Sequence, residues 1–340
     1  MTRKFDIAVV GATGAVGQTM LEVLVERKFP VGKVFALASE SSAGMTVTLG
    51  NREVTVGNLA EFDFSKVAIG LFSAGGSVSA EFAPKAADAG CVVIDNTSHF
   101  RYEDDIPLVV PEVNEHAIAG YENRGIIANP NCSTIQLAVA LKPIYDAVGI
   151  ERINVATYQA VSGAGRSAIE ELVRQTTTLL NGRPLEIEGG AKQIAFNAIP
   201  HIDVFEDNRY TREEMKIVWE TRKIFGDDSI MVNATAVRVP VFYGHSEAVH
   251  IETKDKISAE EVCELLAAAP GVTLLDGTST GEYPTAVTEA SGNDPVYVGR
   301  VREDISHPRG IDLWVVSDNI RKGAALNSVQ IAEILAKNHL

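Results

Sequence analysis

The chain has 340 residues, 46% of them hydrophobic and 22% charged, a composition typical of a globular protein long enough for two domains. Its 45 acidic and 30 basic side chains give a net charge of −15, which disfavours binding to nucleic acid or to anionic membranes. The sequence contains no apolar run of about 18 residues, the length needed to span a membrane. The N-terminus leads into a predicted strand instead of a secretory signal, so we expect a cytoplasmic protein.

The first predicted element is a short apolar strand at 5–10. The sequence Gly-Ala-Thr-Gly-Ala-Val-Gly follows at 11–17, and a helical pattern follows that. Glycines between a first strand and a first helix permit a tight turn and let the backbone approach a pyrophosphate at the helix N-terminus. We therefore expect a dinucleotide to bind here, at Gly11, Thr13, Gly14, Ala15 and Val16.

Further strands and a helix continue this alternation, with strands at 34–38, 67–72 and 91–94 and a helix at 80–89. Such alternation predicts an α/β fold with a parallel, doubly wound (Rossmann-type) sheet. Ligands of such sheets bind beyond the carboxyl ends of the strands, so the turn with Ser73 and Gly75 is a candidate for cofactor contact.

The second strand ends at Ser39, and Glu40, Ser41 and Ser42 follow it. A carboxylate about 20 residues after the glycine turn would accept hydrogen bonds from the ribose hydroxyls of NAD. The three serines can instead donate hydrogen bonds to a 2′-phosphate, although no arginine is present to neutralise it and Glu40 would oppose it. We predict NADP as the cofactor, with Ser39, Ser41 and Ser42 among its contacts.

One of the three cysteines is a candidate catalytic nucleophile. Cys132 lies within Asn-Pro-Asn-Cys-Ser-Thr at 129–134, where a short strand at 125–128 gives way to a helix. Backbone N–H groups and the positive end of the helix dipole favour a thiolate there, whereas the alternative is a small buried hydrophobic side chain. Cys91 and Cys263 lie in apolar segments and are expected to pack in the core. Three scattered cysteines indicate neither a disulfide framework nor a metal site.

The pattern changes after about residue 153 to longer, alternating strands and amphipathic helices, which predicts a mixed α+β second domain. The expected strands are 154–161, 231–239, 247–253, 296–300 and 311–316, and the expected helices are 167–180, 211–225 and 258–268. A last helix at 322–337 could pack back onto the first domain. We predict the domains as 1–130 with 319–340, and 131–318.

A thiolate beside a nicotinamide suggests hydride transfer from a thiohemiacetal to give an acyl-enzyme thioester, and this chemistry needs a base. His245 is the candidate, because Tyr-Gly-His-Ser-Glu at 243–247 places it at a glycine turn between two strands. The guanidinium groups of Arg101 and Arg238 match carboxylate or phosphate, although either could form a surface salt bridge. Glu220 and Lys223 lie three residues apart on one helix, and they could face one site or form a surface ion pair.

The order and wording of several motifs resemble the aspartate-β-semialdehyde dehydrogenase family over nearly the whole chain. These motifs are GATGAVG, SAGGSVS, DNTSHFR, VVPEVN, NPNCST, SGAGRSA, RVPVFYGHSE and the late Ser-Asp-Asn at 317–319. The resemblance implies NADP-dependent interconversion of L-aspartyl-4-phosphate and L-aspartate-4-semialdehyde, with inorganic phosphate as a substrate. It also implies a homodimer in which the mixed α+β second domain serves catalysis and dimerisation, and a role in lysine, threonine and methionine biosynthesis.

The resemblance also implies a role for each matching residue. Cys132 would be the nucleophile, His245 the acid/base, and Gln159 the amide that orients substrate near the sulfur. Arg238 would hold the substrate α-carboxylate and Glu220 its ammonium group. Phosphate would contact Arg101, Asn131 and Lys223, and further cofactor contacts would come from Ser162, Gly163 and Asn319.

Other functions remain open at this point. N-acetyl-glutamyl-phosphate reductase has the same architecture and cysteine chemistry on a substrate one methylene longer. Cys132 and His245 might instead serve a cysteine hydrolase or acyltransferase, but the glycine turn would then lack a purpose. A dinucleotide fold can also belong to a non-catalytic protein.

Overall fold

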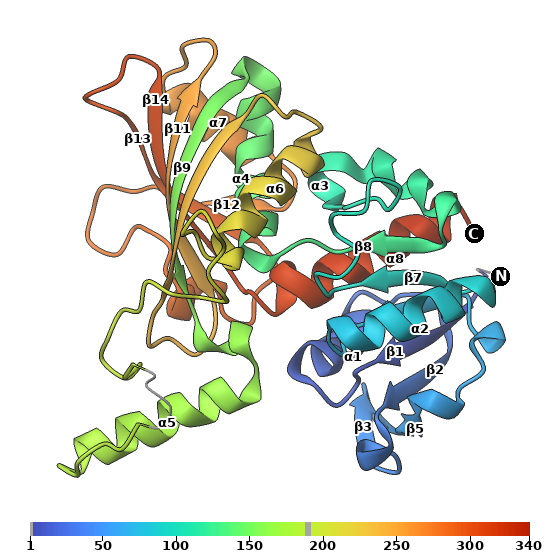
Figure 1. Cartoon of the computed structure of the whole chain (residues 1–340). Coiled ribbons are helices and arrows are strands. Elements are labelled where there is room, and N and C mark those ends of the chain that lie inside the picture. The colour runs from blue at the N-terminus through green and yellow to red at the C-terminus, as the bar shows by residue number, and fades with distance from the viewer. Residues whose placement is uncertain (1–2, 188–191) are drawn as a thin grey trace. The chain divides into compact units, whose positions relative to one another are not determined.

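The computed structural model describes residues 3–187 and 192–340, which divide into two compact units. The first unit comprises Met1–Asn131 with Gly323–Leu340, and the second comprises Cys132–Lys322. Each unit is built on a six-stranded sheet of its own (Figure 1).

The sheet of the first unit is parallel throughout, in the strand order β5-β2-β1-β6-β7-β8. Its strands are β1 (Phe5–Val10), β2 (Val31–Ala38), β5 (Gly57–Asn58), β6 (Ile69–Phe72), β7 (Val92–Asp95) and β8 (Ile126–Ala128). Four of these strands are almost completely buried, which explains why they read as continuous apolar runs in the sequence. The predicted doubly wound parallel sheet is confirmed.

The long helices of the first unit are α1 (Ala15–Glu26), α2 (Gly76–Asp88) and α8 (Leu326–Asn338). The last helix contacts α1 and β7, and its side chains Leu326, Val329, Ala332 and Leu335 are buried in the same apolar cluster as the side chains of β1. The C-terminal helix therefore packs on the first unit, as the sequence predicted. It begins later than residue 322, because a wide, π-helical turn at Arg321–Ala325 precedes it.

Short elements complete the first unit. Two strands that the sequence analysis missed, β3 (Thr46–Leu49) and β4 (Arg52–Thr55), form an antiparallel hairpin. The short helices are α3 (Pro111–Asn114), η1 (Glu40–Ser42), η2 (Leu59–Glu61), η3 (Phe64–Lys66) and η4 (Glu115–Asn123).

The second unit contains a mixed sheet in the order β10-β9-β11-β14-β13-β12. Its strands are β9 (Ile150–Gln159), β10 (Met231–Arg238), β11 (His245–Thr253), β12 (Val272–Leu274), β13 (Val296–Glu303) and β14 (Gly310–Ser317). β9 is parallel to β10 and antiparallel to β11, and β11 is antiparallel to β14. The predicted mixed domain is confirmed.

Helices α4 (Cys132–Val148), α6 (Arg212–Phe225) and α7 (Ala259–Ala268) pack against this sheet, and α5 (Arg166–Leu180) extends away from it (Figure 1). α6 begins at a capping box in which Thr211 and Glu214 satisfy each other's backbone N–H groups, and it ends at Gly226 in the left-handed region. Two short helical turns, η5 (Val161–Ala164) and η6 (Ala286–Ala290), also belong to this unit, and η7 (Arg321–Ala325) spans the boundary with the first unit.

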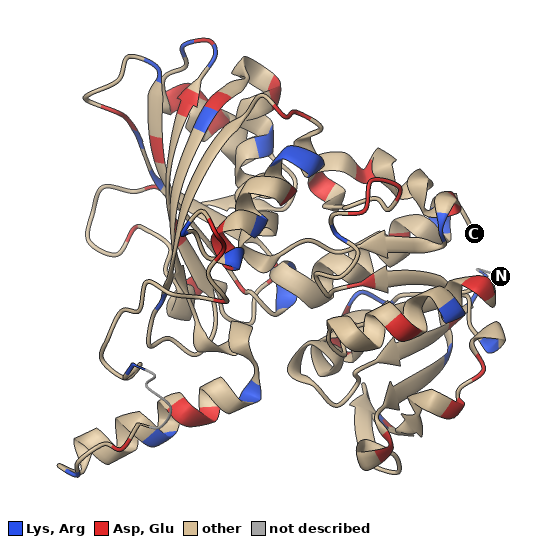
Figure 2. Cartoon of the chain, in the orientation of Figure 1, with Lys and Arg blue, Asp and Glu red and all other residues tan. Residues whose placement is uncertain are grey.

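Acidic and basic residues are interspersed along the chain, including along α2 and α5 (Figure 2). Among the described residues, no helix is both long and apolar enough to cross a membrane.

Candidate active site

Three strands of the second unit bring polar side chains to the same end of the sheet. β9 ends at Gln159, β10 ends at Arg238, and the two residues are partners in the strand register. β11 starts at His245 and runs antiparallel to β9, so that its first residues lie beside the last residues of β9. The turn before His245 uses Gly244 at φ +85°, which confirms the predicted glycine turn.

The His245 side chain is completely buried. Its Nδ1 accepts a hydrogen bond from the backbone N–H of Ala160 at 3.0 Å, and its Nε2 lies 3.4 Å from Nε2 of Gln159. Burial lowers the pKa of His245 to about 3, the positive charge of Arg238 acts in the same direction, and Glu213 partly opposes them. The imidazole is therefore neutral near pH 7, as a proton acceptor must be.

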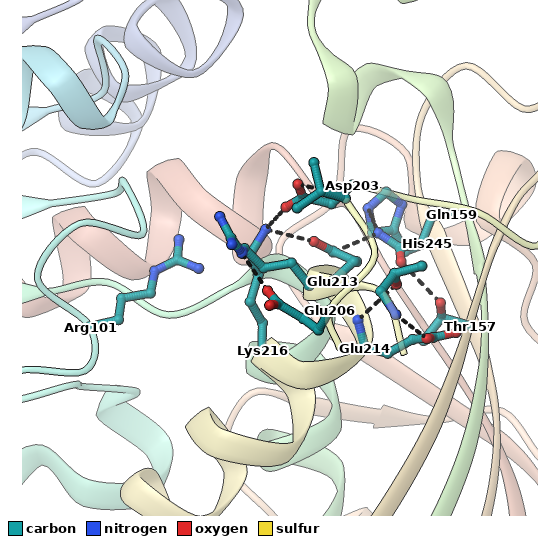
Figure 3. Close-up of polar contacts among 12 residues, drawn as sticks. Arg101, Thr157, Gln159, Asp203, Glu206, Glu213, Glu214, Lys216 and His245 are labelled. Carbon is teal, nitrogen blue, oxygen red and sulfur yellow. Dashed lines mark hydrogen bonds and ion pairs between the residues drawn. The ribbon is translucent and has the colours of Figure 1, made fainter. Parts of the chain in front are cut away.

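The Gln159 amide is held at both ends. Its Oε1 accepts a hydrogen bond from the Thr157 hydroxyl at 3.0 Å, and its Nε2 donates to Oε1 of Glu213 at 3.1 Å (Figure 3). All three side chains are at least nine-tenths buried. This arrangement fixes the amide beside the imidazole.

Glu213 lies in the first turn of α6 and belongs to a network of ion pairs (Figure 3). Nζ of Lys216 donates to Glu213 at 3.0 Å and to Asp203 at 2.8 Å. Burial alone would lower the pKa of Lys216, but the two carboxylates outweigh it and the pKa is raised. Lys216 is thus held in its charged form beside an ionised Glu213.

The Arg238 guanidinium lies beside the same groups. Its NH1 donates to the Ala160 carbonyl oxygen at 2.6 Å. A Cβ placed on Gly163 would lie 3.4 Å from both this NH1 and Nε2 of His245, so the guanidinium and the imidazole border the same space. Burial lowers the pKa of Arg238, whereas Glu213 and the Cys132 sulfur raise it, which places the sulfur within electrostatic reach of the guanidinium.

Cys132 is the first residue of α4 and is partly exposed, and the helix start was predicted. The other cysteines differ from it. Burial raises the pKa of the Cys91 thiol to about 12. Burial raises that of Cys263 to about 11, with help from Asp276, and Cys263 is only partly buried although the sequence placed it in the core.

The remaining predicted residues of this unit have clear positions. Glu220 is fully buried on α6, two turns beyond Glu213. Ser162 and Asn319 are hydrogen bonded to each other at 3.0–3.2 Å, and Oδ1 of Asn319 accepts from the Gly244 N–H at 2.9 Å. Asn319 therefore fixes the turn that leads to His245. Lys223 lies in the last turn of α6.

Sequence reasoning missed Glu213 and Lys216. Together with Glu220 and Lys223 they recur at the spacing i, i+3, i+7, i+10, which places all four on one face of a helix. That spacing was visible in the sequence. Only their burial shows that this face is turned inward.

The first unit contains a pocket of about 530 Å³. It is lined by Gly11, Thr13, Gly14, Ala38, Ser39, Glu40, Asn58, Leu59, Ala60, Ser73, Ala74, Val78 and Phe82. A Cβ on Gly11 would lie 2.5 Å from the Ser73 carbonyl oxygen, and one on Gly17 would lie 2.2 Å from the Gly11 carbonyl oxygen, so both positions require glycine. The pocket lies at the N-terminus of α1, where the sequence analysis expects a dinucleotide.

Other predicted cofactor residues lie around the pocket. Ala15 and Val16 form the first turn of α1, and Gly75 caps the N-terminus of α2 at φ +95°. Ser41 and Ser42 lie in η1, and the Ser41 hydroxyl is 2.9 Å from that of Ser39.

The predicted phosphate ligands Arg101 and Asn131 belong to the first unit, and both are more than nine-tenths buried. NH2 of Arg101 donates to the Asn96 carbonyl oxygen at 2.8 Å. Burial raises the pKa of Asp95, and Arg101 is one of the groups that oppose this rise. The burial of Arg101 therefore argues against a surface salt bridge, the alternative that the sequence left open for this residue.

Two family models match the chain. Residues 6–121 match the semialdehyde dehydrogenase NAD-binding domain, and residues 141–322 match the semialdehyde dehydrogenase dimerisation domain. An aspartate-semialdehyde dehydrogenase from Legionella pneumophila is 66% identical over 340 residues, which cover 100% of this chain and 98% of that protein.

Solved structures agree. The crystal structure of aspartate semialdehyde dehydrogenase II from Vibrio cholerae, complexed with ASA, is 63% identical with a TM-score of 0.97, and the match covers 100% of each chain. The Candida albicans aspartate semialdehyde dehydrogenase with NADP is 26% identical with a TM-score of 0.77, and the match covers 98% of each chain. The chain therefore belongs to the aspartate-semialdehyde dehydrogenase family of oxidoreductases.

Proposed function

We propose that this protein catalyses the reversible, NADP-dependent conversion of L-aspartyl-4-phosphate to L-aspartate-4-semialdehyde and phosphate through a thioester on Cys132. The main support is the arrangement in the second unit. A neutral, buried imidazole lies beside a fixed amide and an arginine, and the arginine is within electrostatic reach of a cysteine at a helix start. By family, the reaction would serve lysine, threonine and methionine biosynthesis.

In the oxidative direction, the Cys132 sulfur would attack the aldehyde carbon while His245 accepts the thiol proton, and the oxyanion of a thiohemiacetal results. A bound nicotinamide would supply the hydride acceptor that converts this oxyanion to a thioester. Inorganic phosphate would then attack the thioester carbonyl, which forms the acyl phosphate and releases the sulfur as a thiolate, while the proton of the attacking phosphate passes to solvent. His245 returns its proton to that sulfur.

Substrate recognition is assigned to charged groups. Arg238 is proposed to pair with the α-carboxylate, because a guanidinium offers two parallel N–H donors. Glu220 is proposed for the ammonium group, Gln159 for orientation at the sulfur, and Arg101, Asn131 and Lys223 for phosphate. The family resemblance supports these roles, and Arg238 has the further support of its position beside His245.

NADP is the proposed cofactor. Gly11, Thr13, Gly14, Ser39 and Ser73 line the first-unit pocket, and the hydroxyls of Ser39 and Ser41 could donate to a 2′-phosphate. Glu40 also lines the pocket, and the described lining includes no arginine or lysine, so we expect a modest preference over NAD.

We also propose a homodimer through the second unit, in accord with its match to a dimerisation domain. Tyr158 is 38% exposed on the sheet and its ring lies 5.6 Å from that of Trp314. Replacement of Tyr158 by glutamate should lower the mass measured by light scattering from that of a dimer to that of a monomer.

The test of function is phosphate-dependent reduction of NADP⁺ by aspartate semialdehyde, with NAD⁺ and N-acetyl-glutamate semialdehyde run in parallel. Phosphate-dependent activity with the aspartyl substrate is expected, and Cys132→Ala should abolish turnover while NADP still binds. Arg238→Lys should raise KM through loss of the bidentate contact. No activity with any pairing, or near-normal turnover by the Cys132 variant, would refute the proposal.

A further inference from the structure

Two buried polar side chains, Gln136 and Glu247, lie behind the candidate nucleophile and base. Gln136 follows Cys132 by four residues on α4, so the two share a face of that helix. Glu247 follows His245 by two residues on β11 and lies on the same face of that strand. α4 packs against β11, and the Gln136 side chain interacts with the Glu247 carboxyl group. The two side chains therefore connect the helix of the nucleophile to the strand of the base.

The contact between these two side chains is one step behind the reacting groups on both elements. Four residues of helix and two residues of strand each advance the chain by about 6–7 Å. The Cys132 sulfur is within electrostatic reach of Arg238, whose guanidinium borders the same space as the His245 imidazole. The helix and the strand thus start at the same place, and their first contact behind it is made by the buried amide and carboxyl group.

The chemistry of this contact is incomplete as an ordinary hydrogen bond. Both side chains are almost completely buried, and among the described residues none of their four polar end atoms makes a hydrogen bond of good geometry. Burial favours the protonated form of Glu247, whose pKa lies well above its usual range. A protonated carboxyl group complements an amide, because its O–H can donate to the amide oxygen while the amide N–H donates to its carbonyl oxygen. These two bonds would satisfy all four atoms, as buried polar groups require.

We propose that Gln136 and Glu247 form a reciprocal pair with two hydrogen bonds, and that this pair positions the Cys132 sulfur relative to the His245 imidazole. Both are positioning residues, since they act through the elements that carry the reacting groups. Hydrogen bonds fix the helix on the strand more narrowly than apolar contacts do, because they depend on direction. A reacting group displaced by about 1 Å can lower the rate by about 100-fold. The catalytic part of this inference rests on the proposed function, whereas the pair itself does not.

Infrared spectroscopy tests the pair without substrate. The spectrum of wild type minus that of Glu247→Gln near pH 7 should contain the carbonyl band of one protonated carboxyl group, because all other carboxyl groups are common to both proteins and cancel. Gln136→Leu should move that band to higher frequency, since the carbonyl oxygen loses the amide N–H that it accepts from. Absence of the band in wild type, or a band that Gln136→Leu leaves in place, would overturn the inference.

Kinetics test the positioning role. Glu247→Gln keeps two hydrogen bonds, because two amides can pair in the same way, and its kcat should stay within about twofold of wild type. Glu247→Leu and Gln136→Leu should each lower kcat by about tenfold or more, with KM changed by less than about twofold. The double Leu variant leaves no buried polar group alone and should regain most of the lost stability but not kcat. Equal losses in Glu247→Gln and Glu247→Leu, or wild-type kcat in the double variant, would indicate a merely structural role and overturn the inference.

Thr253→Val is the matched control at the far end of β11. It removes a buried hydroxyl that donates to the Arg309 carbonyl oxygen at 3.0 Å, so it should lower Tm and leave kcat unchanged. If a single Leu variant loses its fold by circular dichroism, Glu247→Gln and the double variant still decide the question. A wild type inactive with aspartate semialdehyde would refute the proposed function alone. Alkylation of Cys132 by iodoacetamide then replaces kcat, and it should be slower in the double variant than in Glu247→Gln.

Discussion

Glu247 carries the sharpest prediction about stability. It lies on β11, two residues beyond His245 and on the same face, and its side chain is completely buried. Neither carboxyl oxygen makes a hydrogen bond of good geometry to another described group. Burial holds the pKa of Glu247 well above its usual range, although an interaction with the Gln136 side chain on α4 opposes this rise.

The consequence is a loss of stability as the pH rises. Above about pH 5 the unfolded chain has an ionised Glu247, whereas the folded chain keeps it protonated. The folded state then binds one proton more, so the free energy of unfolding falls by about 1.4 kcal/mol per pH unit up to the folded-state pKa. The stabilising contribution is fully present below the pKa of the unfolded chain.

Glu247→Gln tests this, because the amide has nearly the same shape but does not titrate. Unfolding followed by calorimetry from about pH 5 to about pH 7 should show wild type losing about 2 °C in Tm per pH unit relative to the variant. Glu260→Gln, at an exposed position on α7, is the control and should follow wild type. Parallel Tm curves for wild type and Glu247→Gln would refute the reasoning.

Three further outcomes are expected. Gly11→Ala should abolish nucleotide binding in calorimetric titration, because φ is +85° and the added Cβ would lie 2.5 Å from a backbone carbonyl oxygen; wild-type affinity would contradict this. Iodoacetamide near pH 7.5 should label Cys132 and spare Cys91, whose pKa is about 12, in peptide mass spectrometry; equal labelling would be the contrary result. A carboxylate bound at Arg238 should weaken its effect on His245 and raise the pKa of that imidazole. The acidic limb of kcat should then lie at higher pH than that of kcat/KM, whereas coinciding limbs would argue against it.

Local sequence patterns predicted the strands of the first unit well because these strands are buried on both faces and hence apolar throughout. The β3–β4 hairpin escaped notice, since each strand has only four residues and alternates or is largely exposed. The C-terminal helix was found from its apolar stripe. Its start was misplaced because the wide turn at Arg321–Ala325 disrupts the helical period.

The candidate site was predictable where local signals coincide with chemistry. Cys132 at a helix start and His245 after a glycine turn are of this kind. Glu213 and Lys216 are not, because a Glu–Lys pair three residues apart on a helix is an ordinary feature of solvent-exposed surfaces. Their importance depends on burial and on the approach of α6 to the end of β9, which neither segment shows alone.

One face of the sheet in the second unit carries a row of buried polar side chains, and these need hydrogen-bond partners from other elements. Thr157, Gln159, His245 and Glu247 occupy alternate positions on β9 and β11 that would otherwise carry apolar side chains. Toward the end of the sheet each group is hydrogen bonded, and α6 supplies the partner that fixes the amide. One step inward, Glu247 lacks a hydrogen bond of good geometry, and burial raises its pKa although Gln136 on α4 opposes this. The position of the imidazole therefore depends on α6, which holds the neighbouring amide, as well as on the strand that carries the imidazole.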